Sequence, residues 1–162
     1  SHPAHAEQDP TRDFQWWIPL QALAFRGLCF VGEQDWDGAL RIEQEVARCR
    51  DVEVLPMDLG TLHEFIGQVI AVRDCGAKAK AYLLEKSAKV LRYDYLASAR
   101  LALLATTYFE PGQTNRIEGI ASPIFERATM CGAFAVAKQA SGILESVRSP
   151  KYRRPAYKSL RA

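Results

Sequence analysis

The sequence predicts an all-α protein. Apolar residues recur at the three- and four-residue spacing of helices, and no useful window shows the alternation of a strand. The chain has 162 residues, about one domain, and 48% of them are hydrophobic, enough to bury a core without disulfides or metals. We expect a disordered arm or tag remnant over residues 1–12, a single all-α domain over 13–147 and a basic tail over 148–162.

The first two helices have clear boundary residues. Pro19 suits the first turn of a helix that runs to about Val31, and Gly32 is a plausible stop. Asp35 can cap the second helix, which ends near Arg50. The apolar positions of this second helix recur at helical spacing, namely Ala39, Leu40, Ile42, Val46 and Ala47.

Three further helices follow a linker. Thr61 and Glu64 have the spacing of a capping box, which predicts the start of the third helix. Gly76 is expected to break it before a fourth helix over about 77–91. A fifth helix, over about 95–109, is rich in Ala and Leu and ends at a Pro-Gly pair.

The C-terminal part is predicted to hold one short helix and one long one. The short helix covers about 116–121, and Ser122 then caps a long helix with Pro123 at its first position. This last helix is expected to reach about Val147. Its uncharged middle, 128–137, places it at the centre of the predicted core.

Two of the helix pairs share a pattern that resembles the tetratricopeptide repeat. Residues 67–88 can be laid over 27–47 at a shift of 40 residues. The matching positions in the first pair are Gly27, Phe30, Trp36 and Ala39, and those in the second are Gly67, Ile70, Ala79 and Ser87. The sequence departs from the family at Glu43, where an aromatic residue is usual, and in the long linker after the first pair. The resemblance covers about residues 20–92 and implies stacked antiparallel helical hairpins, a TPR-like α-solenoid; a single helical bundle is the alternative.

The resemblance implies a non-enzymatic interaction or scaffold domain that binds a peptide or helix of another protein. In such an array the first helix of each pair lines a groove. The groove lacks clustered Lys and Arg, so an amphipathic or extended segment is a better ligand than a terminal carboxylate. By repeat position the groove residues are Gln21, Ala24, Leu28, Val31, Thr61, Glu64, Gln68, Ala71 and Val72.

Two other functions remain open on the sequence. One is a nucleic-acid-associated regulator, because the tail interleaves aromatic residues with cations that can contact phosphates, among them Lys151, Arg153, Arg154, Lys158 and Arg161. The other is a helical enzyme with a dispersed site. The partner could also be a second copy of the chain, if Phe14, Trp16 and Trp17 project from the surface instead of capping the core.

No residue pattern predicts a metal, a cofactor or a membrane partner. Cys29, Cys49, Cys75 and Cys131 form no C-x-x-C pair and are expected to be reduced, mostly buried thiols of a cytoplasmic protein. His63 is expected on a partly exposed helix face, since Gly67 stands where a zinc-protease motif needs a second histidine. The uncharged stretches are too short to span a membrane.

Overall fold

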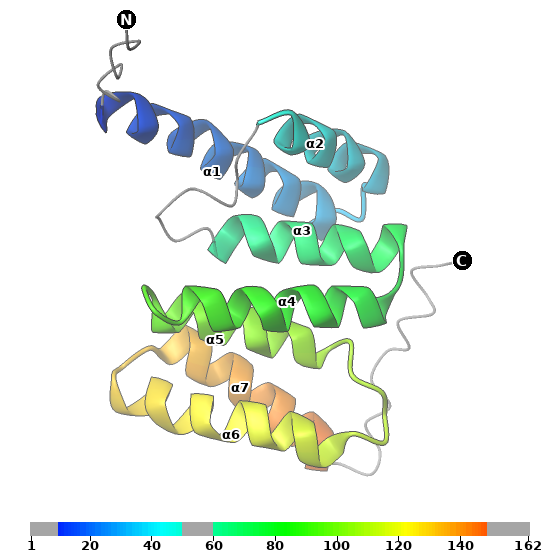
Figure 1. The fold of residues 1–162 in the computed structure, drawn as a ribbon. Coiled ribbons are helices and arrows are strands. Elements are labelled where there is room, and N and C mark those ends of the chain that lie inside the picture. The colour runs from blue at the N-terminus through cyan, green and yellow to red at the C-terminus, as the bar shows by residue number, and fades with distance from the viewer. Residues whose placement is uncertain (1–9, 50–59, 149–162) are drawn as a thin grey trace, which may run out of the picture. The chain divides into compact units, whose positions relative to one another are not determined.

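The computed structural model describes residues 10–49 and 60–148, and these ranges contain helices and no strand. The predicted all-α class is confirmed for this part of the chain. The chain divides into two compact units, residues 1–56 and 57–162, which are described one at a time. The helices, labelled in Figure 1, are α1 (Pro10–Gly32), α2 (Trp36–Arg48), α3 (Gly60–Arg73), α4 (Gly76–Val90), α5 (Tyr95–Thr106), α6 (Thr114–Met130) and α7 (Phe134–Arg148).

The first unit is a hairpin of α1 and α2. Asp35 caps α2 as predicted, because its Oδ1 accepts a hydrogen bond from the backbone N–H of Gly38 at 2.9 Å. The two helices approach closely there, since a Cβ on Gly38 would lie 2.6 Å from the ring of Phe30. The hairpin therefore depends on a glycine at the start of α2.

The start of α1 differs from the prediction. The helix begins at Pro10, so Pro19 lies inside it and residues 10–12 do not belong to an arm. Phe14, Trp16 and Trp17 are part of the helix and do not precede it. Pro10 occupies the helix start, where its missing N–H costs nothing. The 23-residue helix α1 tolerates a second missing N–H at Pro19.

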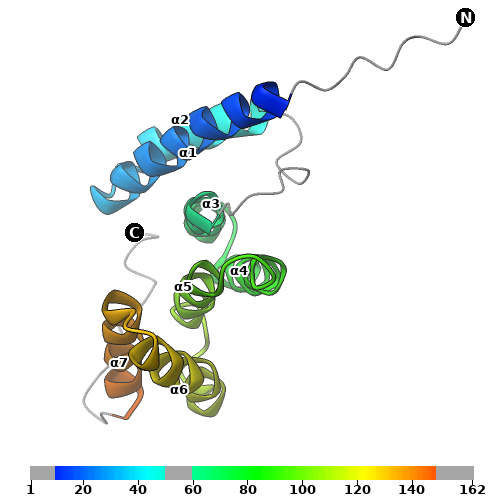
Figure 2. The same ribbon diagram turned by 90° about the vertical axis from the view of Figure 1, so that its left-hand side faces the viewer.

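The second unit, α3 to α7, has two layers. Consecutive helices pack against each other, and α3 also contacts α5, while α5 contacts α7. Figure 2 looks along the helices and shows α3, α5 and α7 on one side with α4 and α6 on the other. The odd-numbered helices therefore run parallel in one layer, and the even-numbered helices run the opposite way in the second layer.

The core of this unit includes two apolar clusters along the stack. The first joins α3, α4 and α5, and the second joins α5, α6 and α7. Between α4 and α5 the buried Ser87 and Ser98 each donate a hydroxyl hydrogen bond to the other residue's carbonyl oxygen at 2.8 Å. The first cluster contains Ala71, Ala79, Leu83, Val90, Leu101, Ala105 and Tyr108; the second contains Ala99, Leu103, Ala121, Ile124, Ala128, Val136, Ala137, Ala140 and Leu144.

The last two helices correct the predicted boundaries. The chain forms α6 across the whole of 114–130, so Pro123 lies inside a helix and Ser122 does not cap one. The uncharged stretch 128–137 contains the turn between α6 and α7 and is not the middle of a central helix. Gly132 has a φ of +75° there, and the N–H groups of Ala133 and Gly132 bond back to Ala128 and Thr129 as in a Schellman motif.

Candidate functional site

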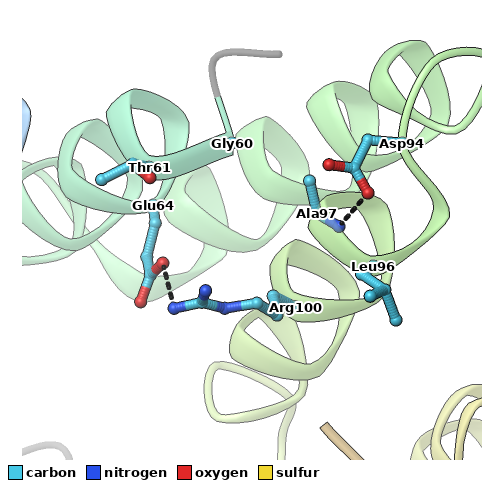
Figure 3. A pocket seen from close by; sticks show the side chains of 7 residues that line it. All are labelled: Gly60, Thr61, Glu64, Asp94, Leu96, Ala97 and Arg100. Carbon is cyan, nitrogen blue, oxygen red and sulfur yellow. Dashed lines mark hydrogen bonds and ion pairs between the residues drawn. The ribbon is translucent and has the colours of Figure 1, made fainter. Parts of the chain in front are cut away.

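A small pocket opens between the first turns of α3 and α5 (Figure 3). It measures about 130 Å³ and has polar and apolar walls in similar amounts. Because α3 and α5 are parallel neighbours, their N-terminal turns lie side by side and supply the whole lining. The lining residues are Gly60, Thr61, Glu64, Asp94, Leu96, Ala97 and Arg100.

An ion pair joins the two helices across this pocket. Arg100 Nη2 lies 3.4 Å from Glu64 Oε2, and the arginine side chain is more than half exposed while the glutamate is mostly covered. Burial raises the pKa of the Glu64 carboxyl, and the positive charge of Arg100 opposes this rise. A guanidinium has five N–H donors, so Arg100 can hold Glu64 with one edge and still donate to a ligand with another.

The second carboxylate in the pocket wall, that of Asp94, stabilises the start of α5. Asp94 caps α5 by accepting a hydrogen bond from the N–H of Ala97 at 3.1 Å, and Figure 3 shows its carboxylate turned toward that group. Leu96 is exposed at the rim and supplies the apolar wall. The pocket therefore combines a presented cation, a half-buried carboxylate and an exposed leucine.

Exposed apolar side chains gather at the same end of the second unit. This end is where α3, α5 and α7 begin and where α4 and α6 finish (Figure 1). The large hydrophobic residues that are exposed within 60–148 lie at this end or, for Phe125, five residues before it on α6; Met130 is 87% exposed and Phe134 is 75% exposed. We call this set the apolar turn surface; it consists of Leu91, Tyr93, Leu96, Phe125, Met130 and Phe134.

The two turns that carry this surface are linked through a cation–π contact. The Arg127 guanidinium of α6 stacks 3.8 Å from the centre of the Tyr95 ring at the start of α5. The opposite end of the unit differs, because the aromatic residues of its α5–α6 turn are buried. Phe109 lies between the Lys80 ammonium at 4.9 Å and the Arg116 guanidinium at 5.4 Å. The exposed apolar side chains are thus specific to the end that holds the pocket.

The groove residues predicted on α3 are only partly brought together. Thr61 and Glu64 line the pocket, while Gln68 and Val72 are half-buried further along α3. Ala71 was placed in the groove wrongly, because its methyl group packs in the core against α4 and α5. The predicted capping box also fails as a helix start: α3 begins at Gly60, so Thr61 lies inside it, and Glu64 pairs with Arg100.

The groove residues predicted on α1 belong to the first unit. Gln21, Leu28 and Val31 are half-buried, and Ala24 is completely buried, so Ala24 has no surface to offer a ligand. Sequence reasoning missed Asp94, Leu96 and Arg100. The resemblance was taken to end near residue 92, although the four-residue spacing of Leu96 and Arg100 places both on one face of the next helix.

His63 is a buried residue, which corrects the predicted exposed position. Its Nδ1 shares a hydrogen bond of 2.8 Å with the Tyr82 hydroxyl, and the two rings meet edge to face. Burial, together with the nearby positive charges of Lys86 and Lys89, lowers the pKa of His63 to about 4. The imidazole is therefore neutral at physiological pH and holds α3 to α4.

The cysteines are free but not mostly buried. Cys29 and Cys131 are exposed, and Cys49 and Cys75 are half-buried. The predicted buried role of Cys131 is wrong because it lies in the α6–α7 turn. Within the described ranges no group of three metal-binding side chains occurs, and no helix there is long and apolar enough to cross a membrane. The tail cations predicted to contact nucleic acid lie outside the described residues.

No family model matches the chain, and neither a curated protein nor a solved structure is similar enough to it to match. Since a fold alone does not specify a function, any assignment depends on the chemistry of the site.

Proposed function

We propose that the protein is a non-enzymatic interaction domain, and that its second unit holds a segment of a partner protein against the parallel helices α3, α5 and α7. The observation that carries the proposal is the pocket between α3 and α5, with the exposed Arg100 and Leu96 on its rim.

The two-layer arrangement supports this proposal. Contacts between α3 and α5 and between α5 and α7 are the ones expected if helical hairpins stack, because the first helix of each pair then forms one continuous face. A TPR-like solenoid is the arrangement we propose for this unit. Its binding face would then carry the pocket at the boundary between two neighbouring hairpins.

The pocket also indicates the kind of segment that would bind. A guanidinium that is already held by Glu64 is oriented for a carboxylate, and a bidentate contact of this type is among the stronger polar interactions. Leu96 offers an apolar contact beside it. We therefore expect an amphipathic segment with an acidic residue next to an aliphatic or aromatic one.

A peptide-display selection tests this function. A random peptide library is selected on the full chain, and enriched peptides are measured by fluorescence anisotropy against the wild type and two charge reversals. Arg100→Glu removes the presented cation, whereas Lys78→Glu makes the same change at an exposed site at the far end of α4. We expect Arg100→Glu to weaken binding at least about tenfold, which corresponds to about 1.4 kcal/mol, while Lys78→Glu has little effect.

Two results would contradict the proposal. One is a selection that enriches no peptide above the background of the support. The other is a set of peptides that bind the Arg100→Glu and Lys78→Glu variants equally well, since the pocket would then make no contribution to binding.

A further inference from the structure

Two neighbouring turns of the second unit carry the most exposed members of the apolar turn surface. Met130 and Phe134 flank the α6–α7 turn, and Tyr93 lies in the α4–α5 turn with 68% of its surface exposed. The contact between the Arg127 guanidinium and the Tyr95 ring holds these turns side by side, at the end of the unit that faces the viewer in Figure 2. Apolar side chains that project together in this way mark an interaction surface.

The two turns are positively charged. Segments 89–93 and 127–134 contain three exposed cations and no carboxylate, the cations being Lys89, Arg92 and Arg127. Asp94 and Glu126 bound the segments, and the Asp94 carboxylate is turned to its contact with α5. Glu85 pairs with Lys89 at 3.1 Å, but both side chains are about 60% exposed, so an anion can compete for this cation. The turns are therefore complementary in charge to an anionic surface.

Cations also stand about one helical turn behind the apolar tips. Three such pairs are separated by three or four residues along the chain: Lys89 and Tyr93, Arg127 and Met130, and Lys138 and Phe134. One helical turn is about 5.4 Å long, and an apolar face in a membrane interface lies roughly 5–10 Å deep. When the tips reach that depth, the cations behind them lie at the level of the lipid headgroups.

The polar groups of these turns are bonded within the protein. The N–H groups of Tyr93 and Asp94 both bond to the carbonyl oxygen of Val90 at 2.9 Å. The hydroxyl of Thr129 donates to the carbonyl oxygen of Phe125 at 2.7 Å. In the α6–α7 turn three further N–H groups bond back to α6 at 2.8–3.3 Å, those of Cys131, Gly132 and Ala133. Backbone groups paired in this way lower the cost of entering a lipid environment.

We propose that the apolar turn surface docks the protein on an anionic lipid bilayer. Tyr93, Met130 and Phe134 reach the boundary between headgroups and acyl chains, and the cations behind them contact lipid phosphates. Tyr93 suits this level because its ring is apolar while its hydroxyl stays in the wet headgroup region. The docking does not depend on the peptide proposed for the α3–α5 pocket, since Glu64 and Arg100 take no part in it.

A bilayer fits these turns better than a folded protein does. Side chains that project singly from turn tips need matching hollows on a protein partner, whereas lipid tails close around them without a preformed surface. No membrane partner was predicted from the sequence, because a search for a span looks for one continuous apolar stretch. Here two short segments that are far apart in the sequence meet only through the packing of α5 with α6.

Vesicle co-sedimentation tests the docking. The full chain is mixed with vesicles of phosphatidylcholine, with or without phosphatidylserine, and the pelleted fraction gives a partition coefficient. We expect the coefficient to be at least about tenfold larger on the anionic vesicles and to fall at high salt, because salt screens the attraction to phosphates. Equal binding to both kinds of vesicle, or no binding to either, overturns the proposal.

Two matched changes at exposed phenylalanines show which surface inserts. Phe134→Glu places a carboxylate on the apolar turn surface, and Phe25→Glu makes the same change on α1, where Phe25 is 56% exposed. Both variants keep the basic segment 148–162, so any attraction of that segment to lipid is the same in the two. We expect Phe134→Glu to lower the coefficient at least about tenfold and Phe25→Glu to leave it near the wild-type value. Equal coefficients for the two variants would contradict insertion of the turns.

A fluorescent label tests the orientation on the bilayer. One chain keeps Cys131 and has its other three cysteines changed to Ser; the control has all four changed and carries Thr107→Cys, an exposed position at the opposite end of α5. Each single thiol is labelled with nitrobenzoxadiazole, whose emission shifts to the blue in an apolar environment. We expect a blue shift at position 131 on anionic vesicles and none at 107. Equal shifts at both positions, or a shift at 107 alone, would overturn the proposal.

Discussion

Residues that bridge two helices decide the geometry of the second unit. Glu64 and Arg100 join α3 to α5, His63 and Tyr82 join α3 to α4, and Ser87 and Ser98 join α4 to α5. None of these pairs was predicted, because a single sequence shows the residues of one helix face but not the partner that lies opposite. By contrast, Asp35 could be predicted as a cap, since its partner is only three residues away.

The buried His63 makes stability depend on pH. Its pKa of about 4 in the folded chain lies below the ordinary value of 6.5, so the unfolded chain takes up the proton first as the pH falls. The contribution is complete above pH 6.5 and is lost between 6.5 and 4. Between pH 7 and pH 5 we expect a loss of at most about 2 kcal/mol of unfolding free energy.

Urea unfolding followed by circular dichroism measures this loss. Wild type and His63→Gln are compared at both pH values, because glutamine stays neutral and can still bond to Tyr82. We expect the wild type to lose more stability than the variant on acidification. Equal losses in the two proteins would show that His63 is not the group that titrates.

At the scale of elements, the contact between α3 and α4 depends on Gly67. Gly67 and Ala79 are the small residues of the repeat pattern in this helix pair, but a Cβ on Gly67 would overlap the side chain of Leu83 and lie 2.7 Å from its Cγ. Leu83 is completely buried in the first apolar cluster, so a shift of its side chain would disturb that core. The glycine is thus required by a large neighbour and not by a small one.

Substituting two helical glycines separates this packing effect from helix propensity. Gly67→Ala should destabilise the protein by about 1–3 kcal/mol, because the new methyl group overpacks the core. Gly142→Ala, at an exposed position in α7 with nothing within 4 Å, should instead stabilise it by up to about 1 kcal/mol. Urea unfolding measures both, and two variants of equal stability would contradict the close α3–α4 contact.

Helix boundaries were predictable where a local signal was strong and unpredictable where composition dominated. The end of α1 at Gly32 and the start of α5 after Asp94 agree with the sequence patterns. The α6–α7 turn was missed because ten uncharged residues suggested a buried helix, although Gly132 supplied the signal for a turn. Pro123 was predicted to begin a helix but lies inside α6, because an exposed proline is tolerated there.

At the scale of the whole molecule, the all-α class followed from periodicity, but the candidate site did not. Thr61 and Glu64 were selected by repeat position, and both line the pocket. Their partners Leu96 and Arg100 come from a helix some 30 residues later, and only the parallel packing of α3 and α5 brings them together. Contacts over such a separation depend on how the helices pack, which local patterns do not encode.

The central claim is that the α3–α5 pocket binds a protein segment, and a nuclear magnetic resonance titration tests it most directly. A selected peptide is added to the ¹⁵N-labelled full chain, and the shifts of the backbone amides are followed. The account predicts the largest shifts at Thr61, Glu64, Leu96, Ala97 and Arg100. Shifts confined to α4 and α6, or to residues outside the second unit, would contradict it.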